Sequence, residues 1–136
     1  MTEPLVSLCV PTRNRAEGLA RGLASTCGQD YGRLEILISD NASDDHTERV
    51  CREMAAEDNR IRYIRQPKNI GLYGNHNFCL DESRGEFVCF FHDHDDRDPF
   101  IVSRYVRFMQ EHPTVGVVCS DWNVINAAGQ RIDSRE

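Results

Sequence analysis

The sequence predicts a single α/β domain, residues 1–136, with a mainly parallel sheet, and three observations support this. Short apolar runs alternate with longer amphipathic stretches along most of the 136 residues. The runs are too short for helices and long enough for buried strands. The length and the 40% hydrophobic content fit one compact domain with one core. Strands that alternate with helices favour parallel pairing through right-handed crossovers.

The first strand and helix are predicted from an apolar run and from four-residue periodicity. Residues 5–10 form an apolar run that ends at Pro11, which is typical of a buried strand. Residues 17–27 repeat apolar side chains every four positions, and Gly28 follows them as a helix C-cap would. Residues 34–39 begin the next unit as a second apolar strand.

The same alternation continues through the middle of the chain. The polar run 43–45 offers N-caps for a helix expected from about 46 to 57. Residues 61–64 make a third short strand. A third helix is expected from about 73 to 83.

The last part of the chain predicts two more strands and one more helix. Residues 86–91 form an apolar strand closed by acidic residues. Asp98–Pro99 is a favourable helix start, with a capping carboxylate and proline at the first helical position. Residues 115–119 predict a fifth strand, 124–130 a turn, and 131–133 the start of another strand.

Charge and hydropathy exclude several classes of protein. There are 16 Lys and Arg against 22 Asp and Glu, so the net charge is −6 and the surface repels nucleic acid and anionic lipid. No run approaches the roughly 18 to 20 apolar residues of a membrane span, and the first residues do not resemble a signal peptide. We expect a cytoplasmic protein that meets a membrane only peripherally.

The six cysteines do not indicate a disulfide framework. Three lie in the expected strands and three in helical patterns, and no CxxC pair occurs. Free, mostly buried thiols in a reducing compartment are expected, and zinc knuckles are not.

Polar segments follow the first four expected strands. In open α/β sheets, ligands bind outside the carboxyl ends of the strands. Turn chemistry accounts for any one such segment, but four at the same edge indicate a ligand site. The segments are residues 11–15, 40–45, 66–71 and 92–96.

The segment after the fourth strand carries the strongest chemical signal. Asp93, Asp95, Asp96 and Asp98 crowd four carboxylates together, which favours a bound cation. Oxygen ligands select hard cations, and Mg²⁺ or Mn²⁺ held by one or two carboxylates completes its shell with water and substrate phosphates. A phosphorylated substrate is therefore expected. Asp98 is interpreted only as a helix cap.

Other motifs give weaker support to other kinds of site. His92, His94 and Asp96 match the start of the metallo-β-lactamase zinc motif, but Arg97 stands where histidine is needed and the strand order is different. The sequence contains no GxGxxG, no GxxxxGK[ST] and no GxSxG, so dinucleotide, P-loop and serine hydrolase sites lack support.

Four motifs in series resemble family 2 glycosyltransferases of the GT-A fold, from about Leu5 to Gly129. They are PTRNR (11–15), SDNASDD (39–45), NIG (69–71) with Asn77 and RGE (84–86), and FHDHDD (91–96). The resemblance implies a Rossmann-like, three-layer β/α sandwich that binds a nucleotide-diphospho-sugar, by default a UDP-sugar. It also implies Mg²⁺ or Mn²⁺ and transfer with inversion to an acceptor that the sequence does not identify.

The resemblance assigns roles position by position. Thr12 and Asn14 would lie near the nucleoside, Asp40 would accept a hydrogen bond from the base, and Asp93-His94-Asp95 would be the DxD motif. The alternative interpretation of Asp44 is helix capping. The alternative for Asn77 is an amide on the surface of a helix, without a role in the site. The implied donor-binding residues are Pro11, Thr12, Arg13, Asn14, Asp40, Asn41, Asp44, Asn69, Gly71, Asn77, Asp93 and His94, and the implied metal ligands are Asp93 and Asp95.

The chain departs from the family after the fifth expected strand. The family's general base lies several tens of residues beyond DxD, whereas this chain ends at Glu136, and Asp121 stands too early for that role. We therefore expect a C-terminally truncated, donor-binding part that lacks the acceptor and base segment. A non-catalytic binding module is the alternative, and a nucleotidyltransferase is disfavoured because Pro11 to Arg15 is not a glycine-rich basic loop.

Overall fold

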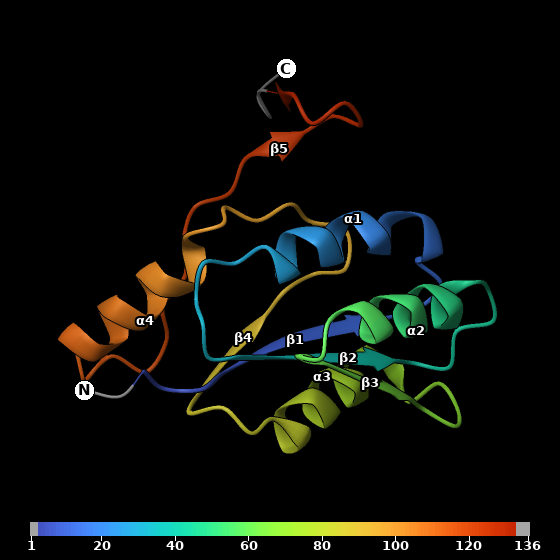
Figure 1. Ribbon diagram of the computed structural model, residues 1–136, viewed down its shortest axis with the longest axis horizontal. Helices are drawn as coiled ribbons and strands as arrows, with labels where there is room; N and C mark the ends of the chain where they lie inside the picture. Colours follow the sequence, from blue (N-terminus) through green and yellow to red (C-terminus); the bar gives the residue numbers. More distant parts are fainter. Residues whose placement is uncertain (1–2, 133–136) are drawn as a thin grey trace.

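The computed structural model describes residues 3–132, and it contains a central sheet, four helices and a separate hairpin (Figure 1). The strands are β1 (Val6–Thr12), β2 (Leu34–Asp40), β3 (Ile61–Arg65), β4 (Phe87–Phe90), β5 (Val124–Ile125) and β6 (Arg131–Ile132). The helices are α1 (Ala16–Cys27), α2 (Thr47–Glu57), α3 (Gly71–Glu82) and α4 (Ile101–Glu111).

The central sheet has the strand order β3-β2-β1-β4, and all its pairings are parallel. Thr12 pairs with Asp40, and Asp40 pairs with Arg65, so the carboxyl ends of three strands are level. β4 ends beside Cys9, and the acidic segment that follows therefore runs along the last residues of β1. The predicted parallel α/β sheet is confirmed.

Helices cover both faces of this sheet, which gives the predicted three layers. α1 and α2 lie on one side and α3 on the other (Figure 1). Along β1, Val6, Leu8 and Val10 enter the larger core with α1, α2 and α4, whereas Cys9 enters a smaller core beneath α3. This alternation follows from the two-residue repeat of a strand that is buried on both faces.

The predicted helices are present with small shifts at their starts. α3 begins at Gly71, two residues earlier than expected, because Gly71 adopts φ +79° and its N–H donates to Asn69 Oδ1 at 2.9 Å. α4 begins at Ile101 rather than at Pro99, and Asp98 Oδ1 accepts from Phe100 N at 2.8 Å just before it. The N-cap position of α4 is Phe100 and has no side-chain cap, so Asp98 stabilises the turn before the helix and is not the helix cap that the sequence suggested.

The fifth strand predicted over residues 115–119 is wrong. This segment has no regular structure, and Val117 is 83% exposed. A strand needs a neighbour to pair with, and among the described residues β4 pairs only with β1. An apolar cavity of about 310 Å³ separates residues 116–118 from β4, so the valine-rich pattern has no partner in the described part of the chain.

The end of the described chain forms a short antiparallel hairpin. β5 and β6 pair through Val124–Ile132 and Ile125–Arg131. The predicted turn between them is confirmed at its centre, where Gly129 adopts φ +78°. The strand expected over 131–133 is confirmed for its first two residues, and Asp133 lies outside the described residues.

All six cysteines are free, as predicted, and burial keeps most of the thiols protonated. Burial raises the pKa of Cys51 to about 12 and the pKa values of Cys27 and Cys89 to about 11. Cys119 is the one exposed thiol among the described residues. None of the helices in the described part of the chain is both long and apolar enough to cross a membrane.

Candidate functional site

Four polar segments meet at the carboxyl edge of the sheet and are joined by direct hydrogen bonds. The polar segments that follow β1 and β2 are linked by Asp44 N, which donates to Asn14 Oδ1 at 2.9 Å. The β2 and β3 segments are linked by Asn41 Nδ2, which donates to Asn69 Oδ1 at 2.9 Å. The polar segments therefore cluster at this edge of the sheet, as predicted.

Asp93 is a buried carboxylate held between two elements. Its Oδ2 accepts from Thr12 Oγ1 at 2.7 Å, and its Oδ1 lies 2.8 Å from His94 Nδ1. Thr12 is 3% exposed and Asp93 is 7% exposed. A buried carboxylate with a donor to each oxygen is fixed in orientation, which anchors the start of the acidic segment to the end of β1.

Asp95, two residues further, is more open. Arg97 Nη2 donates to its Oδ2 at 3.0 Å, while its Oδ1 makes no hydrogen bond with the described residues and lies 3.7 Å from His94 Nε2. The Arg97 guanidinium packs on the Phe91 ring at 4.7 Å, which holds it in place. Asp95 therefore offers one carboxylate oxygen for a ligand.

The other two acidic residues of this cluster point elsewhere. Asp96 forms an ion pair with Arg21 of α1 at 2.8 Å, and Asp98 Oδ1 accepts from Phe100 N in the turn before α4. Within residues 3–132, no group of three or more His, Cys, Asp or Glu side chains is placed to hold a metal ion. Two carboxylates alone suit a cation that takes its remaining ligands from water and phosphate, as Mg²⁺ does. Asp95 keeps one oxygen free for an ion of that kind, whereas both oxygens of Asp93 already accept hydrogen bonds.

Asp40 lies at the end of β2 and has no exposed surface. Its Oδ1 accepts from both the backbone N–H and the hydroxyl of Ser43, and its Oδ2 accepts from the Tyr63 hydroxyl at 2.7 Å. Arg65 Nε lies 3.8 Å from the same oxygen. Burial and the neighbouring Asp40 raise the pKa of Tyr63 well above its ordinary value. Asp40 therefore stabilises the loop that follows β2, from the buried side of that loop.

Two acidic residues after β2, Asp44 and Asp45, make different contacts. The Asp44 side chain is exposed, whereas Asp45 Oδ1 accepts from Thr47 N at 2.9 Å at the start of α2. Asp45 Oδ2 also accepts from Ala16 N at 3.2 Å at the start of α1. The capping alternative considered for Asp44 therefore belongs to Asp45, which leaves the Asp44 carboxylate free at the rim.

Two asparagines of α3 lie in different environments. Asn77 is exposed on the helix surface, whereas Asn75 is buried against the end of β2. Asn75 Oδ1 accepts from Ser39 Oγ at 2.6 Å, and its Nδ2 donates to Ser39 O at 2.9 Å. Sequence reasoning missed Asn75, although its spacing of four residues from Gly71 places it on the same helix face.

The remaining residues expected at the site lie around its rim. Pro11 is partly buried within β1, while Arg13 and Asn14 are exposed just beyond the strand. Asn14 adopts φ 51°, a conformation that asparagine tolerates better than most residues. The turn directs the Asn14 amide toward the β2 segment, where it accepts from Asp44 N.

Comparison with known families identifies this arrangement. The profile of the family described as "Glycosyl transferase family 2" matches residues 7–131. The chain belongs to glycosyl transferase family 2. The match includes all four polar segments of the site, so the resemblance found in the sequence is confirmed.

Relatives of this family 2 chain include enzymes with named activities. It is 40% identical over 94 residues to the GalNAc(5)-diNAcBac-PP-undecaprenol beta-1,3-glucosyltransferase of Campylobacter jejuni, covering 68% of this chain and 30% of that protein. A solved structure of the mannosyltransferase PcManGT from Pyrobaculum calidifontis, in complex with GDP-Man and Mn²⁺, has a TM-score of 0.78 at 26% identity. It covers 85% of this chain and 34% of that chain.

A third similar structure is S. aureus TarS 1-349 in complex with UDP-GlcNAc. The TM-score is 0.74 at 25% identity, and the match covers 80% of this chain and 32% of that chain. These likenesses confirm the expected GT-A fold for this family 2 member. The chain spans about a third of the length of each of these three relatives.

Proposed function

We propose that this chain is the donor-binding part of a glycosyltransferase that transfers a sugar from a nucleotide diphosphate with the help of Mg²⁺ or Mn²⁺. The observation that carries the proposal is the pairing of Asp93, buried and fixed by Thr12, with Asp95, which keeps one oxygen free. One fixed and one open carboxylate at the sheet edge are suited to a cation that is shared with a diphosphate.

The donor would lie across the edge of the sheet. The nucleoside would occupy the rim formed by the β1, β2 and β3 segments, with Pro11, Thr12, Arg13, Asn14, Asp40, Asn41, Asp44, Asn69, Gly71 and Asn77 around it. Asp93 and Asp95 would hold the cation and His94 would lie beside the diphosphate. Asp40 would act on the base through the loop that it organises, because its carboxylate has no exposed surface.

The chemistry follows from the leaving group. A cation held by Asp93 and Asp95 would supply Lewis-acid stabilisation of the negative charge that develops on the diphosphate. A carboxylate base on a segment beyond Glu136 would deprotonate the acceptor hydroxyl, which gives one displacement and inversion at the anomeric carbon. We propose a UDP-sugar as donor, and a glycan, lipid or protein acceptor that is met in the cytoplasm or at the membrane surface.

Calorimetric titration tests this function directly. UDP, GDP and dTDP would be titrated into the purified chain with and without Mn²⁺, using the wild type, Asp95→Asn and Asp96→Asn. We expect one nucleotide to bind only with Mn²⁺, and Asp95→Asn to weaken that binding by at least tenfold. Asp96→Asn is the matched control, since its carboxylate is one residue away and paired with Arg21.

The outcomes separate the proposal from its alternative. Binding that ignores Mn²⁺ and Asp95, or no binding of any nucleotide, would contradict a metal-dependent donor site in this chain. Donor hydrolysis or sugar transfer by the chain alone would contradict the alternative of a non-catalytic binding module. Metal-dependent binding without turnover is the result expected if the base lies on another segment.

A further inference from the structure

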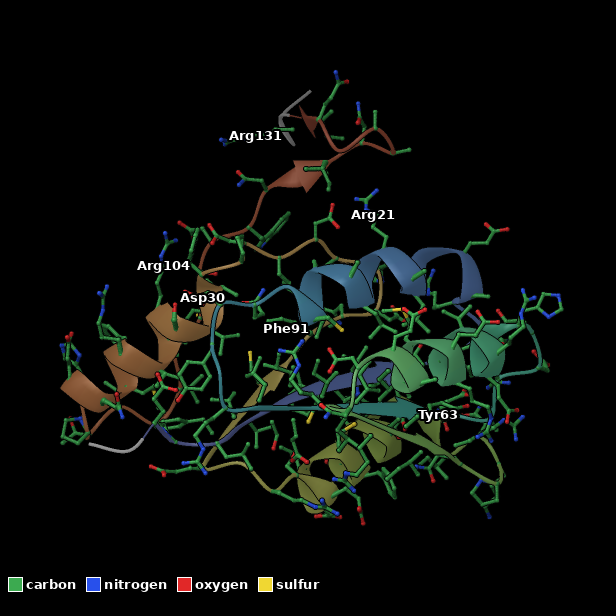
Figure 2. The ribbon with its side chains drawn as sticks, in the orientation of Figure 1. Arg21, Asp30, Tyr63, Phe91, Arg104 and Arg131 are labelled. Carbon is green, nitrogen blue, oxygen red and sulfur yellow. The ribbon has the colours of Figure 1, made fainter. Side chains whose placement is uncertain are left out.

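A cavity of about 490 Å³ lies directly beside the open carboxylate of Asp95. The first turns of α1, with Arg21, form one wall, His94 and Asp95 form the second, and residues 122–127 form the third. Figure 2 shows Arg21 extending from α1 toward the β5–β6 hairpin. The volume is within the range of about 300–1,000 Å³ that small-molecule sites occupy.

The third wall brings an aromatic side chain to this cavity. Trp122 lines it and is 78% exposed, although tryptophan is usually well buried. Asn123 is next to it, and the Asn123 amide makes no hydrogen bond with any described residue. An exposed aromatic ring beside amide and carboxylate groups in a concave site is typical of a ligand-binding surface.

The charges of the cavity limit what it can bind. Residues 122–127 are Trp, Asn, Val, Ile, Asn and Ala, which carry no charge. Arg21 is paired with Asp96, and Asp95 is paired with Arg97, so among the described lining residues Glu17 is the carboxylate that has no ion pair. The cation proposed on Asp95 would be shared with the diphosphate, and an anionic group on the sugar would meet the Glu17 carboxylate and no unpaired Arg or Lys of the lining, so the cavity favours a neutral ligand.

We propose that this cavity holds the donor's sugar, that the sugar is uncharged, and that the Trp122 ring packs against its C–H face. This inference rests on the proposed function. In a nucleotide-diphospho-sugar the sugar is bonded directly to the terminal phosphate, so a cation on Asp95 places the sugar at the cavity. A neutral hexose or N-acetylhexosamine matches the lining, with hydroxyl groups for Asn123 and an apolar ring face for Trp122.

Trp122 is the only tryptophan of the chain, so its fluorescence reports on the cavity without any turnover. With Mn²⁺ present, UDP-glucose should change the emission more than UDP does. UDP-glucuronate, which carries a carboxylate on the same sugar, should behave like UDP alone. GDP and GDP-mannose are compared in the same way, so that the result does not depend on the base.

Calorimetry on variants completes the test. Trp122→Ala should leave the Kd of UDP within twofold and weaken UDP-glucose by about 3- to 10-fold, the contribution of one aromatic contact. Trp122→Phe should keep most of the affinity. Tyr73→Ala is the control, because Tyr73 is an equally exposed aromatic residue on α3, 81% exposed, that does not line the cavity.

Each result decides one of the two proposals. If wild type binds UDP with Mn²⁺ but Trp122→Ala changes UDP and UDP-glucose equally, or changes neither, the sugar site is overturned and the proposed function stands. Tight binding of UDP-glucuronate would overturn the neutral-sugar assignment. If wild type binds no nucleotide, both proposals fall together.

Discussion

The hydroxyl of Thr12, the last residue of β1, donates to Asp93 Oδ2 at 2.7 Å, and both side chains are almost fully buried. The bond joins the end of the central strand to the start of the acidic segment. Removing one donor from a buried carboxylate costs about 1–3 kcal/mol. Thr12→Val should therefore lower the free energy of unfolding in urea by that amount, and weaken Mn²⁺-dependent nucleotide binding with it.

Thr12→Ser is the control for this prediction. Serine keeps the hydroxyl and removes only a methyl group, so the bond to Asp93 and the nucleotide affinity should be retained. Equal loss of nucleotide binding in Thr12→Val and Thr12→Ser would show that the methyl group, and not the hydrogen bond, supports the site.

The close approach of α1 to the acidic segment gives a second prediction. A Cβ on Gly22 would lie 2.5 Å from the carbonyl oxygen of Asp93 and 2.9 Å from its carbonyl carbon. Backbone atoms cannot yield without moving the segment, and such overpacking costs typically about 1–3 kcal/mol. Gly22→Ala should lower the thermal midpoint and weaken Mn²⁺-dependent UDP binding.

Gly18 provides the matched substitution on the same helix. A Cβ there meets nothing closer than 3.6 Å, the Cβ of His94, which is ordinary contact. Because alanine is favoured over glycine by up to about 1 kcal/mol within helices, Gly18→Ala should keep or raise the thermal midpoint. A Gly22→Ala protein as stable as Gly18→Ala would mean that the acidic segment is not held against α1.

The elements that the sequence predicted well are those whose signal is local. The apolar runs of β1 and β2 and the periodicity of α1 depend on residues near one another, so their bounds differ little from expectation. Residues 115–119 carry the same apolar signal but form no strand. Strand formation needs a neighbouring backbone, and sequence periodicity does not indicate whether one is present.

The site was predicted at the level of segments and less well at the level of side chains. The sheet topology alone brings the polar segments to one edge, because parallel strands end together. Which of four neighbouring aspartates faces the site, and that Asn75 is buried while Asn77 is exposed, depends on contacts with distant residues such as Thr12 and Ser39. Those contacts have no signature in the sequence, and the donor-binding roles stay predictions.

The buried Asp40 gives a third prediction. Tyr63→Phe removes the hydroxyl that donates to Asp40 Oδ2 while keeping the ring. Hydrogen bonds to charged groups contribute about 1.5–3 kcal/mol, so the free energy of unfolding in urea should fall by that amount. Tyr105→Phe, which removes an exposed hydroxyl bonded to Ser120, should change stability by less than about 0.5 kcal/mol. Equal effects of the two variants would contradict the buried bond.

The turn before β3 predicts a dependence of stability on pH. Arg60 donates to both carboxylate oxygens of Asp58 through Nε, at 3.0 and 3.2 Å, and this pairing lowers the pKa of Asp58 from 3.8 to about 2. The Asp58 side chain is only 19% exposed, so solvent screening is modest. A shift of this size corresponds to about 2 kcal/mol. Asp58→Asn should therefore destabilise the protein by about 2 kcal/mol at pH 7.

The sign of the pH effect follows from the lowered pKa. The stabilisation by Asp58 is complete above the unfolded-state pKa of 3.8 and is lost as the pH falls from about 4 to about 2. Urea unfolding of wild type and Asp58→Asn across pH 7 to 2 should give curves that converge at the acid end. Asp81→Asn, at an exposed carboxylate of α3, serves as the comparison and should follow the wild type throughout. A difference between wild type and Asp58→Asn that stays constant down to pH 2 would show that the Asp58 carboxylate is not held ionised by Arg60, because protonation of a paired carboxylate must remove the difference.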